Sequence, residues 1–316
     1  MIQSDLQSSL ELNAVGTNAP EFAAYQDEPI QMRSGSVGKS GFLRLRFERR
    51  GTRTILAESE RRIPYLAQRA LYCDEEMPDL AHVFVITTTG CVLQGDRLAL
   101  EILLEEGAFA HVTTQSATKV HGMDANYAVQ TQRVHVKDGA YLEYLPEPLI
   151  PHRASRFLSD TLIRVAPTAS VLMCEIVQPG RKHHRADESF GATLLSLATA
   201  ALRPDGQLLF KEKLLIEPQR RPVRQTGVMR SLDVFGNVVL CAPVEKTERI
   251  YAAVENCIDV AAGIACGVSR LPNGAGLIFK VLGRETEIVR AKVREFVALA
   301  RREITGRNMR SRYFWR

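Results

Sequence analysis

Residues 98–115 read "LALEILLEEGAFAHVTTQ", two strand-like runs separated by a small turn at Gly107–Ala108. The same form recurs in residues 131–148, 160–177 and 199–216, with turns at Gly139–Ala140, Thr168–Ala169 and Gly206–Gln207. Successive turns lie 32, 29 and 38 residues apart. This period predicts stacked β layers that bury a shared face, in a solenoid-like or layered sheet arrangement. An ordinary β-meander also gives evenly spaced hairpins, so that alternative stays open.

The segment before this repeat predicts a hairpin. Residues 43–48, "LRLRFE", alternate apolar and charged side chains, which is the period of a half-buried strand. A turn at Gly51 and a second short apolar run at residues 54–56 follow. Residues 1–38 carry Gln, Ser, Asn, Pro and Glu without a period, so we expect a flexible N-terminal arm there. The ordered domain is expected to span residues 39–306.

After the repeat, the pattern changes to helical spacing. In residues 245–268 the apolar positions Ile250, Val254, Ile258 and Ala262 would share one helix face. A strand at residues 274–283 follows. Residues 285–306 then predict a second helix, with Val289, Val293, Phe296 and Ala300 on one face and Gly306 at its end. The fold class is therefore mainly β (α+β): a layered, β-helix-like stack with two C-terminal helices at about residues 247–306, followed by a basic tail at 307–316.

Composition excludes several classes of protein. The net charge of +5 is too small to indicate nucleic-acid binding, and no apolar run approaches the roughly 18 residues that a membrane helix needs. The N-terminus lacks the basic and apolar regions of a secretory signal, so we expect a cytoplasmic protein. The six cysteines form no C-x-x-C pair and are expected to be small buried hydrophobes.

Motifs for nucleotide or nucleophile chemistry are missing from the sequence. No G-x-S-x-G elbow is present, and Gly95 is followed by Asp96 and Arg97 rather than the Lys-Ser or Lys-Thr of a phosphate-binding loop. Asp96, in "LQGDR", and Glu188, in "GRKHHRADESF", remain as candidates. Carboxylates in such places form turns or salt bridges, or act as oxygen ligands that pass on a divalent ion. Composition does not choose between these roles.

The order of four motifs carries more information than any one of them. They are "TGCVLQGDRL" at 89–98, "EEGAFAHVTTQSATKVH" at 105–121, "DGAYLEYLPEPLIPHRASRF" at 138–157, and Gly180-Arg181 followed by "ESF" at 188–190. In this order they resemble the UreD (UreH) family of urease accessory proteins, from about residue 41 to residue 306. Tyr144 stands where that family usually has Trp, and Gly90-Cys91 where it has Gly-Gly.

The resemblance implies a non-catalytic urease maturation chaperone with a mostly β stack. Such a scaffold binds apo-urease subunits and UreF, and UreG through UreF, in a hetero-oligomer that guides nickel into the urease active site. No cofactor is permanently bound, Ni²⁺ is in transit, and neither nucleic acid nor a membrane is a partner. Asp96 and Glu188 would line the nickel channel or its entrance, and Lys119, in the "TTQSATKV" segment, would face a partner.

Two other classes remain as alternatives. A carbohydrate-active enzyme on a β-solenoid would need a pair of well-placed carboxylates on the solenoid face. The strand-like runs of the repeats are mainly apolar and carry few Asp or Glu at matching places, which argues against this alternative. A stable metal-binding protein would bind nickel tightly and stoichiometrically without any partner.

Overall fold

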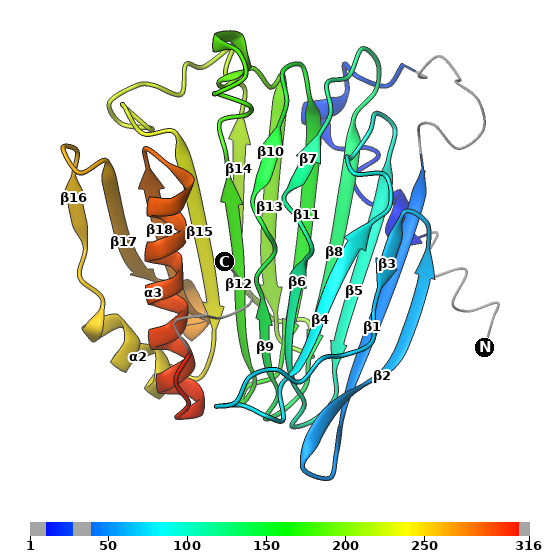
Figure 1. Ribbon diagram of the computed structural model, residues 1–316, viewed down its shortest axis with the longest axis vertical. Coiled ribbons are helices and arrows are strands. Elements are labelled where there is room, and N and C mark those ends of the chain that lie inside the picture. The colour runs from blue at the N-terminus through cyan, green and yellow to red at the C-terminus, as the bar shows by residue number, and fades with distance from the viewer. Residues whose placement is uncertain (1–10, 28–38, 310–316) are drawn as a thin grey trace.

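The computed structural model describes residues 11–27 and 39–309, and within them two β-sheets pack face to face (Figure 1). One sheet has seven strands, and we call it the first sheet. Its order is β14 (Leu208–Ile216), β13 (Leu194–Leu202), β11 (Arg156–Val165), β8 (Ala128–Val136), β5 (Arg97–Leu104), β1 (Ser40–Arg50) and β2 (Arg53–Arg62).

The second sheet has eleven strands. Its main order is β16 (Cys257–Asp259), β17 (Ile264–Arg270), β18 (Gly276–Gly283), β15 (Val234–Cys241), β12 (Ser170–Val177), β9 (Tyr141–Tyr144), β6 (Phe109–Thr114), β4 (Ala81–Thr87) and β3 (Tyr65–Ala67). Off this path, β10 (Leu149–Pro151) pairs with β12 and with β7 (Thr118–Val120). The helices are α2 (Val244–Ala253) and α3 (Thr286–Thr305), with short 3₁₀ turns at η1 (Pro20–Phe22), η2 (Ala186–Glu188) and η3 (Pro272–Gly274).

The first three repeat units each connect the two sheets. β5, β8 and β11 lie parallel in the first sheet, and their continuations β6, β9 and β12 lie parallel in the second. Gly107 and Gly139 turn the chain between the sheets with φ of 64° and 65°, a region that glycine adopts without strain. This arrangement confirms the predicted layered stack, and it identifies the layers as parallel strands rather than a meander.

The fourth unit differs from the other three. β13 and β14 form an antiparallel hairpin within the first sheet, so the chain does not cross to the second sheet. The second run of this unit contains Lys211 and Lys213, both exposed. β12, in contrast, lies inside the second sheet and is buried along most of its length. A strand with alternating lysines fits a half-solvated edge and not a position covered on both faces.

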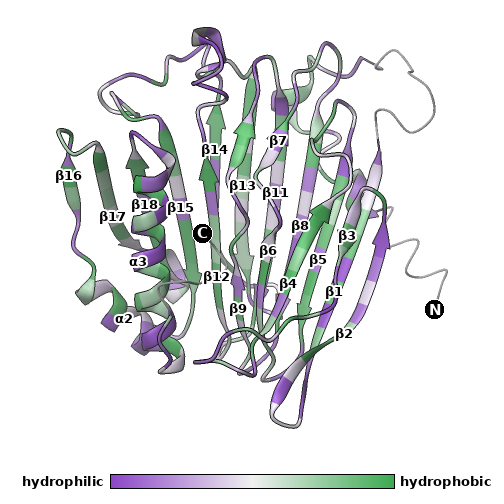
Figure 2. Cartoon of the chain, viewed as in Figure 1, coloured by the Kyte–Doolittle hydropathy of each residue, from purple (hydrophilic) through white to green (hydrophobic). Residues whose placement is uncertain are grey.

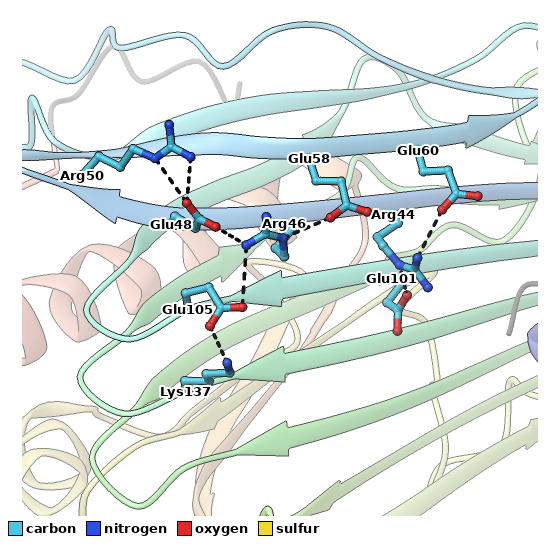
Figure 3. Close-up of polar contacts among 9 residues, drawn as sticks. All are labelled: Arg44, Arg46, Glu48, Arg50, Glu58, Glu60, Glu101, Glu105 and Lys137. Atoms are coloured by element: carbon cyan, nitrogen blue, oxygen red, sulfur yellow. Dashed lines mark hydrogen bonds and ion pairs between the residues drawn. The ribbon is translucent and has the colours of Figure 1, made fainter. Parts of the chain in front are cut away.

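β1 and β2 form the predicted hairpin, and β1 buries Leu43, Leu45 and Phe47 in the core between the sheets. The charged residues of β1 lie on the outer face, and hydrophilic colour recurs along both strands in Figure 2. There they form a ladder of ion pairs with neighbouring strands (Figure 3). The ladder comprises Arg44, Arg46, Glu48, Arg50, Glu58, Glu60, Glu101, Glu105 and Lys137.

α3 covers the outer face of the second sheet, where it contacts β18, β15 and β12 (Figure 1). Its predicted apolar face is confirmed, because Val289, Val293, Phe296 and Ala300 are all buried. The Phe296 ring stacks on Phe279 of β18 at 4.7 Å between centroids. Gly306 ends the helix with φ of 71°, and its N–H donates to the Arg302 carbonyl.

The predicted helix over residues 245–268 is wrong beyond Ala253. α2 ends there, and the following residues form the hairpin of β16 and β17, in which Ile258 is 84% exposed. Asn256 Oδ1 accepts the Val268 N–H at 3.0 Å, and Asp259 Oδ1 accepts the Ala262 N–H at 2.8 Å. Short polar side chains that bond backbone groups in this way compete with the helix and favour turns.

Residues 11–27 pack onto the first sheet, whereas the sequence predicted a loose arm up to residue 38. Phe22 is fully buried and stacks on Tyr127 at 4.4 Å between centroids. The Tyr127 hydroxyl oxygen lies 3.0 and 2.7 Å from the carbonyl oxygens of Gly16 and Thr17. These aromatic contacts outweigh the polar composition of the segment. The rest of the predicted arm, and the tail from residue 310, lie outside the described residues. No helix among those described has the length and apolarity to cross a membrane.

Candidate functional site

Three small cavities lie in a row between the two sheets. Their volumes are about 30, 50 and 10 Å³. The first and second share Thr114, Thr118, Gln130 and Tyr144 as lining residues, and the second and third share Glu175. The row therefore crosses the stack, from the β4 and β5 side to the β14 and β15 side.

Polar side chains line this row, although the surrounding interface is apolar. Tyr144 donates its hydroxyl to Gln132 Oε1, and Gln132 Nε2 donates to Ser159 Oγ at 3.2 Å. Ser159 Oγ in turn lies 3.4 Å from Glu175 Oε1. Burying polar groups between sheets costs free energy unless hydrogen bonds satisfy them, so each of these side chains needs the partner that it has here. Such a continuous line breaks the apolar pattern of the interface, and breaks of this kind mark functional or strained sites.

Glu175 and Glu212 mark the far end of the row, where both line the third cavity. Burial raises the pKa of Glu175 to about 7, and the negative charge of Glu212 adds to this, while the Ser159 hydroxyl opposes it. Glu212 is ion-paired with Lys280 and accepts from Asn237 Nδ2 at 3.4 Å. Glu175 therefore keeps its proton to a higher pH than an exposed glutamate does.

The "TTQSATKV" segment forms the near end of the row. Thr114, Gln115, Ser116 and Thr118 line the first cavity. Thr114 Oγ1 also accepts the Glu147 N–H at 2.9 Å, which ties this segment to the neighbouring layer. Lys119 lies exposed on β7 beside it, and its contact with a partner stays a prediction.

Asp96 is fully buried at the turn before β5. Its Oδ1 accepts the Lys39 N–H at 2.9 Å, and its Oδ2 accepts the Leu93 N–H at 2.8 Å. Burial raises the pKa of this carboxyl, and these backbone bonds oppose the shift. With one donor on each oxygen, Asp96 braces the turn, which is one of the two roles that the sequence left open.

Glu188 is engaged in the same way at the end of η2. Arg181 Nη2 lies 2.5 Å from Oε1, and the Arg153 N–H donates to Oε2 at 3.2 Å. The hydrogen bond from Arg181 is the main reason that the pKa of Glu188 falls to about 2. Neither Glu188 nor Asp96 lines the three cavities, so their role in passing nickel stays a prediction. Among the residues that the structure describes, no group of three or more His, Cys, Asp or Glu could hold a metal ion.

The sequence did contain a signal for the row, and it was missed. Glu175 is the lone acid in the buried run "SVLMCEIV", and Gln130 and Gln132 interrupt the apolar alternation of β8. A single polar residue in an apolar strand is a weak signal until the pairing of strands is known. The register of β8 with β11 places Thr161 opposite Gln132 and Ser159 opposite Gln130, and only then do the polar positions form one line.

The raised pKa of Glu175 gives a first prediction. A carboxyl whose pKa is higher in the folded state than in the unfolded state binds more protons when folded. Its contribution to stability is therefore full below about pH 4.5 and is lost as the pH rises to about 7. We therefore expect the difference in unfolding free energy between Glu175→Gln and the wild type to depend on pH. Between pH 4.5 and pH 8 it should shift in favour of the variant by about 2 kcal/mol. Urea unfolding at the two pH values measures this, and an unchanged difference would contradict it.

Comparison with known proteins identifies a family model and several relatives that match this chain. A family model described as "UreD urease accessory protein" matches residues 39–316. A protein of Yersinia pseudotuberculosis serotype O:1b (strain IP 31758) is 53% identical over 309 residues, covering 98% of this chain and 96% of its own. Similar proteins of Yersinia enterocolitica serotype O:8 and Photorhabdus laumondii are 52% and 51% identical, and they cover 98% and 97% of this chain and 96% and 95% of their own. All three are named "Urease accessory protein UreD".

Proposed function

Since the chain belongs to the UreD family of urease accessory proteins, we propose that it is a cytoplasmic urease maturation chaperone that passes Ni²⁺ between its two sheets. The observation that carries the proposal is the row of polar cavities that ends at Glu175 and Glu212. The ion is cargo in this proposal, and no cofactor is permanently bound.

The chemistry of the row suits an ion that must be released. Amide, hydroxyl and carboxylate oxygens are weaker ligands for Ni²⁺ than imidazole or thiolate, so they replace part of its water shell without trapping it. Cavities of 30 and 50 Å³ hold a water molecule or two beside an ion. Glu175, with its pKa of about 7, exchanges a proton for the ion near neutral pH, and this exchange keeps binding reversible.

The proposal includes partners at both ends of the row. Apo-urease is the acceptor, and UreF, with UreG bound through it, is on the supply side of a hetero-oligomer. Lys119 is exposed on β7, next to Thr118 at the near end of the row, and is proposed as part of a partner contact. A competing path for the ion would use Asp96 and Glu188 as channel or entrance residues. We favour this path less, because donors within the protein already occupy the oxygens of both carboxylates.

The size of the cavities argues against the carbohydrate-active alternative. Glu175 and Glu212 are two carboxyls with different environments, which a glycosidase would also need. The cavity that they share has a volume of only about 10 Å³, and the one beside it about 50 Å³. A sugar ring needs several times this space. We therefore keep urease maturation as the one proposed function.

The decisive experiment compares two double variants in cells that co-express urease and its accessory proteins. Glu175→Gln/Glu212→Gln alters the row, whereas Asp96→Asn/Glu188→Gln alters the two turns. We expect the row variant to capture urease as the wild type does, while the nickel content and activity of urease fall about tenfold or more. The measurements are a pull-down, metal analysis of the purified urease and its ammonia release.

The turn variant serves as the matched control, because it also removes two largely buried carboxylates. If it assembles but leaves urease without nickel while the row variant does not, the ion follows the Asp96 and Glu188 path. If the wild type captures neither urease nor UreF, the chaperone function itself is wrong.

A further inference from the structure

Two cysteines face each other on the β16–β17 hairpin, at the edge of the second sheet. Cys257 and Cys266 are cross-strand partners in the register of this antiparallel pair. Residues directly opposite in such a pair have Cα atoms about 4.5 or 5.5 Å apart. Both values fall within the 4.4–6.8 Å range that a disulfide spans. Both thiols are free and partly exposed, so the sequence-based expectation of buried cysteines fails here.

The same two cysteines line a cavity with a volume of about 490 Å³, which is much larger than the three cavities between the sheets. Its other walls come from the end of α2, from β18 and from α3, and they include Phe279 of β18 and Phe296 and Leu299 of α3. Lys292 and Glu295 also line it, joined by an ion pair of 2.6 Å. The cavity is therefore large enough for a small molecule to reach both sulfur atoms.

We propose that Cys257 and Cys266 form a dithiol site that reacts with a low-molecular-weight disulfide. One cysteine thiolate attacks a sulfur of the small disulfide, whose S–S bond breaks and releases one thiolate. The second cysteine thiolate then attacks the mixed disulfide and releases the other. The cysteine pair loses two electrons and two protons and becomes a disulfide, while the small disulfide gains both electrons and both protons and becomes two thiols.

The pairing, rather than an activated thiol, makes this site reactive. Burial raises the pKa of Cys266, and the charge of the Cys257 thiolate adds to this, whereas a hydrogen bond from the Cys257 backbone and the charge of Lys292 oppose it. The first attack is therefore slow. The second attack is intramolecular, because the resolving thiol is already opposite the mixed disulfide, and such proximity gives a high effective concentration. The product is the internal disulfide and not a stable adduct.

The other cysteines lack this arrangement. Cys174 and Cys241 are buried in β12 and β15. Cys73 and Cys91 are partly exposed, but they lie outside the strands and so have no cross-strand cysteine. Disulfides in a reducing compartment are usually transient and redox-sensing. The proposed site would therefore respond to the redox state independently of the nickel path.

The test uses the reduced full-length chain and glutathione disulfide as the probe. After titration under native conditions and trapping of free thiols, trypsin without reductant gives a peptide of residues 250–270, which contains Cys257 and Cys266 and no other cysteine. We expect this peptide to lose two hydrogen atoms at a disulfide concentration about tenfold lower than the one that modifies Cys73. In Cys257→Ser, the reaction should stop at a glutathione adduct on Cys266.

Phenylarsine oxide, which bridges two neighbouring thiols, provides a second measurement that does not depend on oxidation. We expect one equivalent to bind to the wild type and to the control Cys73→Ser, and none to Cys257→Ser or Cys266→Ser. The proposal is overturned if glutathione accumulates on both cysteines of the wild-type peptide, or if Cys257→Ser binds the arsenical as well as the wild type does.

Discussion

Replacing Arg301 with Met is expected to lower the free energy of unfolding by about 3–5 kcal/mol. Arg301 is fully buried in α3 and reaches the second sheet with its whole guanidinium group. Its Nε and Nη2 atoms each lie 2.7 Å from an oxygen of Glu143 in β9, and its Nη1 lies 2.6 Å from Asp74 Oδ2. Methionine fills a similar volume but leaves two buried carboxylates without their cation.

The surroundings of Glu143 explain why the loss is large. Burial by itself would raise the pKa of this carboxyl, but the charge and hydrogen bonds of Arg301 and the His111 ring hold it well below its usual range. Tyr141 also donates its hydroxyl to Glu143 at 2.6 Å. Glu143 is thus built to stay ionised inside the protein, which is tolerable only while its cation remains.

Chemical denaturation of the purified chain measures the effect of Arg301→Met. The matched control is Arg302→Met, at the next position of the same helix, where the side chain is 56% exposed and pairs with Glu303 at 3.4 Å. We expect that change to cost less than about 1 kcal/mol. Arg301→Met combined with Glu143→Gln should lose less than the sum of the single changes. Equal losses at residues 301 and 302 would show that the buried network contributes nothing.

Gly276→Ala is expected to have the second largest effect, with a loss of about 4 kcal/mol or more. Gly276 begins β18 with φ of 138°, and a Cβ atom there would lie 1.9 Å from the Leu240 carbonyl oxygen. That oxygen belongs to the backbone of β15, which lies in the middle of the second sheet and cannot move away without breaking its pairing with β12. The native position therefore has no space for any side chain.

The control for this change is Gly107→Ala, in the first turn between the sheets. Gly107 also has positive φ, at 64°, but an added Cβ would meet no atom within 4 Å. We expect a loss of about 1 kcal/mol there, from backbone strain alone. Melting temperatures of the two variants separate the steric effect from the conformational one. Similar losses in both would mean that β15 yields to the added methyl group.

The parts of the fold that the sequence predicted are those that local patterns determine. The alternation in residues 43–48 predicted the β1–β2 hairpin, and the regular small turns predicted the layers. No local pattern tells on which sheet a strand ends, so the hairpin of β13 and β14 was indistinguishable from a fourth layer. The helical spacing from Ile250 to Ala262 failed for a related reason, since apolar spacing does not show that Asn256 accepts a hydrogen bond from Val268 in β17.

The candidate site was predicted less well than the fold. Motifs drew attention to Asp96 and Glu188, but a motif does not reveal that backbone and arginine donors already occupy both carboxylates. Glu175 and Gln132 belong to different sheets, and Ser159 connects them only through the packing of β11 against β12. A row of polar groups assembled from separate strands exists only in the tertiary structure.

The two ends of the first sheet differ from its parallel middle. The β1–β2 hairpin closes one end and the β13–β14 hairpin closes the other. β2 meets solvent beside a ladder of arginines and glutamates, and β14 presents Lys211 and Lys213. Adding another chain to either edge would require these charges to lose water, which is how natural sheets prevent edge-to-edge polymerisation. The charged hairpins thus act as the terminal caps of a repeat stack, and they limit its growth to the layers of a single chain.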